Sequence, residues 1–350
     1  MIVTSQVHAR IAGMSVLLVT HESSAKHVSP PGHPERPERL DAAIDGVLGA
    51  GVDIVRRHAL AVDRGLLERV HSSEFIEEIR AFCSRGGGAI DDDTYAVAAS
   101  YEAAIHAAGA GPAAVDSILA GNYDGAFVAM RPPGHHAEES LAMGFCLFNN
   151  VAITATYLTL LGNRVAVVDW DVHHGNGTQN TFLDNPDVLY VSIHQSPFYP
   201  GTGLISDTGV GKGRGMTVNI PLPAGTKSTT YLGSFGRVVV PIVEQFSPDW
   251  ILVSNGYDAH RLDPIGGLML ESADYGVLTG WAASQVTGGR IITMLEGGYD
   301  LDAISESSSA TTVGLARPVG PDWWPNDMLS ATAEVSDRVV ETMREFWKFR

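Results

Sequence analysis

Cysteine is scarce in this chain of 350 residues, which contains only Cys83 and Cys146. Two cysteines do not provide a disulfide framework, and their scarcity suits a reducing compartment. The sequence has no run of about 18 or more apolar residues, which argues against a transmembrane helix. Near the N-terminus, the apolar stretch 15–20 is interpreted as a buried strand and not as part of a signal peptide. These absences predict a cytoplasmic protein.

Clusters of lysine and arginine are also absent, and the formal net charge is −17. Binding to nucleic acid phosphates requires a positively charged surface, so we expect no direct nucleic acid partner, and no membrane partner either. The acidity is compatible with cationic substrates such as lysine-rich tails or polyamines, although it commonly serves solubility alone. A homo-oligomer is compatible with this composition.

Repeats, low-complexity segments and obvious linkers are lacking, so we expect one domain over residues 1–350. The motifs G-x-S-x-G and H-E-x-x-H do not occur. The glycine-rich stretch 209–215 matches neither a Walker loop nor a dinucleotide-binding turn. The common serine hydrolase, zincin and nucleotide-binding motifs therefore do not apply.

Short apolar runs rich in β-branched residues alternate with longer alanine-rich stretches. This alternation predicts an α/β fold with a parallel sheet that is covered on both faces. The expected strands are 15–20, 125–130, 164–169, 187–194, 250–255 and 290–296. The expected helices include 100–120, 149–162 and a C-terminal helix at about 330–349.

Polar motifs follow five of these strands. They read "RPPGHH", "DWDVHHGNG", "SIHQ", "GYDAH" and "EGGYD" in chain order. Ligands bind at the carboxyl edge of open parallel sheets, so five such motifs at one edge predict a functional site there.

The stretch "DWDVHHGNGTQ" (169–179) places Asp169, Asp171 and His173 two residues apart. If the strand continues through them, all three side chains point to the same side. The alternative is a polar loop that caps a helix, where aspartate is common. The motif alone does not decide between a metal site and a loop.

"SNGYDAH" (254–260) adds a carboxylate, Asp258, at another strand end. Asp171, His173 and Asp258 form a plausible set of three ligands, and three protein ligands with an open position are typical of a catalytic zinc. Fe²⁺, Co²⁺ and Mn²⁺ also accept this set.

The adjacent histidines His135 and His136 follow two stiff prolines. One histidine can serve as general base and the other as general acid. Asp169 is a natural partner for one ring and Asn176 for the other, which would keep the two rings at different basicity. His174 is expected to serve only as support.

Tyr299 stands on a glycine-flexed turn, "EGGYD". Its phenol could donate a hydrogen bond to a developing oxyanion. The alternative is an ordinary buried tyrosine.

Taken together, these motifs resemble the zinc-dependent histone deacetylase superfamily. "GHPERPERL", "RPPGHH", "GFCLFNNVA", "DWDVHHGNGTQ", "SIHQSPFYPGTG", "NGYDAH" and "EGGYD" match it in order and spacing, over about residues 15–310. Within it, the sequence resembles the class II branch and bacterial deacetylase-like amidohydrolases, to which acetylpolyamine amidohydrolases are related.

The resemblance implies an arginase/deacetylase fold, with a mostly parallel central sheet of about eight strands. It implies zinc on Asp171, His173 and Asp258, catalytic roles for His135 with Asp169 and His136 with Asn176, and an oxyanion-binding role for Tyr299. It also implies a potassium ion, held by Asp169, Ser192 and the backbone carbonyls of Asp171, His173 and Ile193.

The resemblance further implies a tunnel for the acylated side chain. Phe145 matches one wall, and Phe198 or Tyr199 the other. Asp93 is expected to bind the substrate backbone, and Ile265 stands where polyamine deacetylases carry an acidic gatekeeper. The remaining tunnel positions are Gly144, Gly297 and Gly298.

The implied activity is hydrolysis of acetyl or other short acyl groups from lysine side chains, with an acylated lysine peptide or a small acylated amine as partner. Acetylpolyamine hydrolysis is the second hypothesis, because the overall acidity favours cations while apolar Ile265 does not. A catalytically weak sensor that binds acyl-lysine or metal is the alternative from another class. An arginase-like ureohydrolase, which requires two metal ions, ranks third.

Overall fold

The computed structural model describes residues 15–319, 332 and 334–349. At its centre lies a sheet of eight strands in the order β2-β1-β5-β10-β9-β6-β7-β8, and every neighbouring pair is parallel. In sheet order the strands are β2 (Asp53–His58), β1 (Ser15–Thr20), β5 (Gly125–Val128), β10 (Ile291–Leu295), β9 (Trp250–Asn255), β6 (Val165–Asp169), β7 (Val188–Gln195) and β8 (Thr217–Leu222).

The central strands are apolar on both sides because helices cover both faces of the sheet. In β1, Val16 and Leu18 pack into one hydrophobic core, whereas Leu17 and Val19 pack into the other. The same alternation continues along β5, β6 and β7, as the period of two residues in a strand requires. The sheet is therefore buried as a parallel sheet must be.

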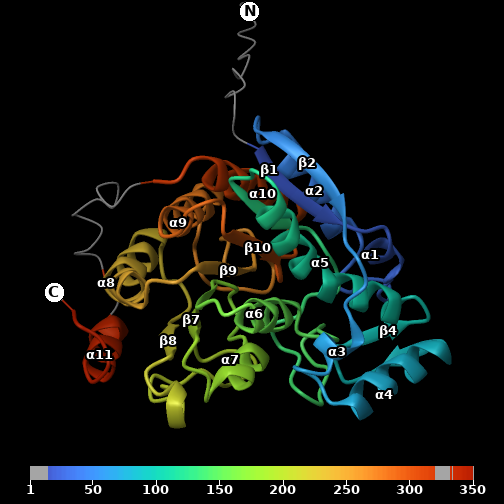
Figure 1. The fold of residues 1–350 in the computed structure, drawn as a ribbon, viewed down its shortest axis with the longest axis horizontal. Coiled ribbons are helices and arrows are strands. Elements are labelled where there is room, and N and C mark those ends of the chain that lie inside the picture. The colour runs from blue at the N-terminus through green and yellow to red at the C-terminus, as the bar shows by residue number, and fades with distance from the viewer. Residues whose placement is uncertain (1–14, 320–331, 333, 350) are drawn as a thin grey trace, which may run out of the picture.

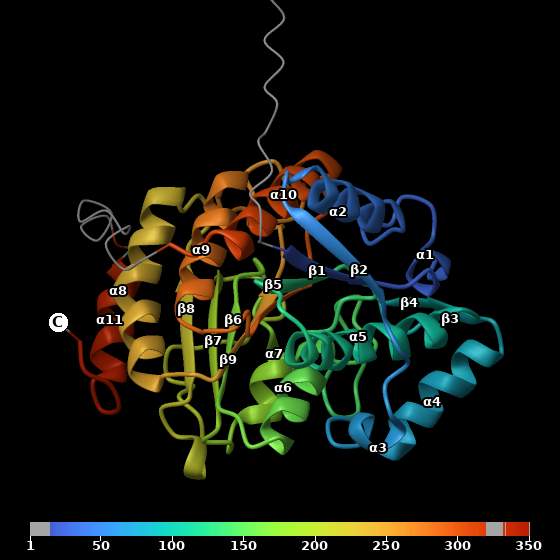
Figure 2. The same ribbon diagram turned by 45° about the horizontal axis from the view of Figure 1, so that its top comes forward.

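Figures 1 and 2 show the helices on the two sides of the sheet. One side carries α2 (Glu38–Gly49), α8 (Ser228–Phe246), α9 (Ser272–Ser284), α10 (Leu301–Ala316) and α11 (Glu334–Met343). The other carries α3 (Arg64–Leu67), α4 (Ser73–Ser84), α5 (Ser100–Ala120), α6 (Asn150–Leu160) and α7 (Asn176–Phe182).

Smaller elements complete the described fold. α1 (Ser23–Lys26) follows β1, and a single turn of 3₁₀ helix spans Gly211–Gly213. β3 (Gly87–Ala89) and β4 (Tyr95–Val97) form a separate antiparallel pair. In the described residues, no helix is long and apolar enough to cross a membrane.

The six expected strands are all present, with ends within two residues of their predicted positions. The strand ranges read from the sequence missed only the two edge strands of the sheet. β2 reads "DIVRRH" and is largely solvent-facing, and β8 contains Pro221, which an edge strand tolerates. Neither strand shows the continuous apolar pattern of the central ones.

The expected C-terminal helix at 330–349 is too long. Residues 330, 331 and 333 lie outside the described part, and α11 ends at Met343. Beyond it, the chain turns so that Trp347 Nε1 donates a hydrogen bond to the Gly215 carbonyl at 2.8 Å. The segment after α11 is thereby attached to the loop before β8.

Candidate active site and metal centre

The polar motifs lie together because their strands are neighbours. β5, β10, β9, β6 and β7 are consecutive in the sheet, and each of the five motifs follows or ends one of them. In a parallel sheet all carboxyl ends lie at one edge, so motifs more than a hundred residues apart in the chain form one site.

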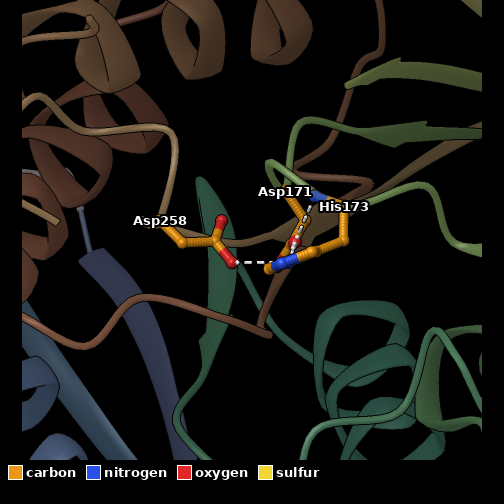
Figure 3. A group of neighbouring side chains, drawn as sticks. All are labelled: Asp171, His173 and Asp258. Carbon is orange, nitrogen blue, oxygen red and sulfur yellow. Dashed lines mark hydrogen bonds and ion pairs between the residues drawn. The ribbon is translucent and has the colours of Figure 1, made fainter. Parts of the chain in front are cut away.

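The floor of the site is the group formed by Asp171, His173 and Asp258. Nδ1 of His173 lies 3.0 Å from Oδ1 of Asp171 and 3.1 Å from Oδ2 of Asp258. Figure 3 shows the two carboxylates approaching the ring from different segments. One ligand atom from each residue lies within 4.8 Å of the others, and within the described residues this is the only such group of metal-binding side chains.

The donor set fits a divalent cation. Both carboxylates are buried, and burial together with the charge of Asp171 raises the pKa of Asp258 to about 7. Two adjacent buried carboxylates repel each other unless a cation compensates them. Oxygen and imidazole donors in a set of three leave a coordination position for water or substrate.

Two glycines let the backbone pack directly against these carboxylates. A Cβ added at Gly256 would lie 2.1 Å from Oδ2 of Asp171, and one at Gly297 would lie 2.1 Å from Oδ2 of Asp258. The Gly297 amide also donates to Oδ2 of Asp171 at 2.8 Å. The glycines of "NGYDAH" and "EGGYD" are therefore required by close approach.

The two adjacent histidines have different partners. Nδ1 of His135 lies 3.1 Å from Oδ2 of Asp169, and Nδ1 of His136 lies 2.8 Å from Oδ1 of Asn176. Burial opposes a charge on His135, but the carboxylates of Asp171 and Asp169 outweigh it and raise its pKa to about 10. Burial and the positive charges of His135 and His173 hold the pKa of His136 well below its usual value. The ring with a carboxylate partner, His135, thus has a raised pKa, whereas the neighbouring ring with an amide partner, His136, has a lowered one.

A cavity of about 190 Å³ opens above the floor. Phe198 stacks on His173 with ring centroids 5.0 Å apart, and Phe145 meets Tyr299 edge-on at 5.9 Å. Phe198 and Tyr199, the two candidates for the second wall, both line the cavity, and Tyr199 is 37% exposed at its rim. Asp93, Gly144, Ile265 and Gly297 also line it.

Gly298 is the remaining position expected in the tunnel wall. It is not among the residues that line the cavity, and its carbonyl accepts a hydrogen bond from the Arg39 side chain. Its φ of +110° and its contact with Tyr257 leave no room for a Cβ. Gly298 therefore shapes the turn behind the wall, which aims Tyr299.

Tyr299 is fixed at the cavity from two sides. Its amide donates to Oδ2 of Asp263 at 2.7 Å, and the Arg39 guanidinium lies 4.9 Å from its ring centroid. Burial raises the pKa of the Tyr299 hydroxyl well above its usual value. The phenol consequently remains a hydrogen-bond donor at physiological pH.

The residues expected around potassium lie on β6 and β7 and in the segment directly after β6. Asp169 and Ser192 are register partners, and Oδ1 of Asp169 accepts a hydrogen bond from the Asp171 amide at 3.2 Å. The Ser192 hydroxyl lies 2.9 Å from Nδ1 of His194, and the Ile193 carbonyl accepts from Tyr231 at 3.5 Å.

His174 points away from the floor. Its Nδ1 lies 2.7 Å from the Thr202 hydroxyl and its Nε2 lies 3.0 Å from Oε1 of Gln179. It supports the loop, as the sequence predicts.

Sequence reasoning missed a buried cluster of charges behind the site. Oε2 of Glu35 accepts from Nη2 of Arg131 at 2.6 Å, and Nη1 of Arg39 lies 3.0 Å from Oε1 of the same carboxylate. All three side chains are buried. Charged residues inside the motifs "GHPERPERL" and "RPPGHH" were the available signal, because such residues are buried only when paired.

Comparisons with known proteins agree with this geometry. The sequence model described as histone deacetylase domain matches residues 33–315. A probable deacetylase of Archaeoglobus fulgidus is 40% identical over 294 residues, which cover 81% of each chain. A histone deacetylase-like amidohydrolase of Pseudomonas aeruginosa is 40% identical over 284 residues, 78% of this chain and 74% of the relative.

A solved structure gives the same result. The crystal structure of the HDA15 HD domain is similar with a TM-score of 0.87 and 36% sequence identity, over 95% of each chain. The chain belongs to the histone deacetylase family, whose deacetylase and amidohydrolase members are hydrolases.

Proposed function

We propose that this protein is a zinc-dependent deacetylase that removes acetyl or other short acyl groups from lysine side chains. The observation that carries the proposal is the convergence, in one cavity, of a three-ligand group, a histidine pair and a buried tyrosine. Zinc is the proposed metal because zinc accepts carboxylate and imidazole ligands, and three protein ligands with an open position are typical of a catalytic zinc.

Asp171, His173 and Asp258 would hold the zinc. When bound, zinc supplies Lewis acidity toward the acyl carbonyl and lowers the pKa of water. Asp169 and Ser192, with neighbouring carbonyls, would hold the proposed potassium ion.

The chain's own residues supply the proton transfers. An imidazole of the His135–His136 pair takes a proton from the attacking water, and an imidazole returns a proton to the leaving amine. Tyr299 donates a hydrogen bond to the carbonyl oxygen while it carries developing negative charge. Water and acyl amide thereby become carboxylate and free amine.

The walls favour an extended, neutral side chain. Phe145 and Phe198 line the passage with aromatic carbon, and Ile265 is an apolar gatekeeper. An apolar residue there offers no ion pair to a distant ammonium group, which favours acyl-lysine.

Acetylpolyamine hydrolysis is the second candidate. Asp91, Asp92 and Asp93 line an adjoining cavity of about 460 Å³ that shares Tyr199 with the first. Three carboxylates beside the mouth would attract a substrate that carries free ammonium groups.

The test is hydrolysis of an acetyl-lysine peptide and of acetylated spermidine by zinc-loaded protein, with Tyr299→Phe as control. Faster turnover of the peptide supports the proposal, and faster turnover of the polyamine favours the second candidate. If the wild-type protein cleaves neither substrate above the level of the control, the proposal fails, and the alternative of a binding module is favoured.

A further inference from the structure

Glu296 is a buried carboxylate that none of the proposed steps uses. It follows β10 directly and its side chain is fully buried. Its Oε2 accepts hydrogen bonds from the backbone amides of Gly134 at 2.7 Å and His135 at 3.2 Å. Glu296 does not line the cavity, so its contact is with the loop that carries the histidine pair and not with the substrate space.

In the rest of the loop that carries the histidine pair, backbone carbonyls accept hydrogen bonds from asparagine side chains. Nδ2 of Asn150 donates to the Pro132 carbonyl at 3.1 Å, and Nδ2 of Asn149 donates to the Ala137 carbonyl at 3.2 Å. Pro132 and Pro133 have no amide hydrogen. The first two amides after the prolines therefore both depend on one oxygen of Glu296.

Glu296 also joins this loop to the one that carries Tyr299. Its backbone carbonyl accepts a hydrogen bond from Arg39, which also binds the Gly298 carbonyl. β5 and β10 are paired in the sheet, so the two loops leave adjacent strand ends. Glu296 therefore lies at the junction of the histidine loop and the tyrosine loop.

We propose that Glu296 is a positioning residue for the deacetylation reaction, which fixes the Gly134–His135 backbone so that the His135 ring meets Asp169 and faces the cavity. The inference rests on the proposed function, because it assigns His135 to the reaction. Glu296 acts through this backbone and touches neither substrate nor metal ligands.

The contact requires the reach of the side chain more than its charge. Only Oε2 is used, because Oε1 is buried without a hydrogen-bond partner. Burial outweighs the attraction of His135 and raises the pKa of Glu296 to about 7. Near neutral pH part of the population is therefore the neutral acid, which still accepts through its carbonyl oxygen.

Two substitutions separate reach from charge. Glu296→Gln keeps the length and one acceptor oxygen but removes the charge, whereas Glu296→Asp keeps the charge and withdraws the oxygens by one methylene. We expect kcat of the glutamine variant within about threefold of wild type and kcat of the aspartate variant at least about tenfold lower, because small misplacements of a catalytic group are costly. KM and zinc content are expected within about twofold in both.

Hydrogen exchange gives a readout that does not depend on turnover. A peptide covering residues 131–136 reports few amides besides those of Gly134 and His135, because of the two prolines. We expect faster exchange in the aspartate variant and nearly unchanged exchange in the glutamine variant. Thr293→Val is the matched control, since it removes a buried hydroxyl from the same strand, bonded to the Ala126 carbonyl at 3.3 Å, without touching this loop.

The outcomes are distinct. If Glu296→Gln loses more kcat than Glu296→Asp, or if neither variant changes kcat, the positioning role is overturned. If wild type hydrolyses no acyl amide, the proposed function fails, and unchanged exchange in Glu296→Asp then overturns the positioning role independently.

Discussion

The floor and the rim of the cavity are built differently. Asp171, Asp258 and the histidine pair are buried. The two carboxylates accept hydrogen bonds from backbone amides that follow β6 and β10, and the histidine rings contact Asp169 and Asn176. Asp93, Tyr199 and Ile265 at the rim stand on loops and remain partly exposed. Several contacts at the strand ends fix the floor, whereas the loops of the rim can change without disturbing it. We therefore expect substitutions in the floor to abolish the reaction and substitutions in the rim to redirect it.

The largest effect is expected from the metal group. Asp258→Asn removes one of three ligands and should lower kcat/KM at least about 1,000-fold, with loss of zinc measured by elemental analysis. Asp302→Asn, on the exposed side of α10, is the control and should retain zinc and activity. An Asp258→Asn variant that keeps its zinc and turns over normally would contradict the ligand assignment.

Tyr299→Phe should have the next largest effect. It removes one hydrogen-bond donor to the developing oxyanion, and we expect kcat to fall about 100- to 1,000-fold with KM little changed. Steady-state kinetics on the acetyl-lysine peptide measure this. A change in KM alone would mean that the phenol binds the ground state and does not act in the reaction.

His71 is a buried histidine behind the floor, and we expect it to affect stability at low pH. It bridges the Glu138 carbonyl at 2.8 Å and the Asn149 amide at 2.9 Å, and burial lowers its pKa to about 4. Between pH 6.5 and 4 the His71 imidazole binds a proton in the unfolded chain but not in the folded one. The free energy of unfolding therefore falls as the pH falls. We expect this histidine to contribute a loss of about 2 kcal/mol between pH 7 and pH 5.

Urea unfolding at the two pH values measures this loss. His71→Gln, which can still donate and accept, should reduce the difference between the two free energies of unfolding. His58→Gln is the control, because His58 is 82% exposed and should not alter it. An equal pH dependence in wild type and His71→Gln would argue against the lowered pKa.

The rim should show the smallest effect, on selectivity. Ile265→Glu adds a charge at the gate, and we expect kcat/KM for acetylspermidine to rise about tenfold relative to the acetyl-lysine peptide, which corresponds to about 1.4 kcal/mol. Ile265→Gln has the same size without the charge and should not change the ratio. An equal shift in both variants would show that size, not charge, sets the selectivity.

The same difference between regions decides which parts of the fold and the site the sequence could predict. Central strands are apolar throughout and their polar ends follow at once, so the positions of Asp171 and Asp258 were readable from the pattern. The edge strand β2 was not, because a solvent-facing strand has no continuous apolar pattern. The pairing of Glu35 with Arg131 was not readable either, because charged residues in the motifs indicate a buried cluster but not which of them pair. The contact between Arg39 and the Gly298 carbonyl was not readable either, because the two residues are 259 positions apart along the chain.

The adjacency of β6 and β9 has a consequence for how the metal group forms. His173 and Asp258 are separated by 85 residues, and their distance is set by the register of the two strands, in which Asp169 is paired with Ser254. A nascent chain carries two of the three ligands long before the third has been synthesised. If this group binds a metal as proposed, all three ligands are available together only after these strands have paired, so we expect binding through the full set to report completion of the fold.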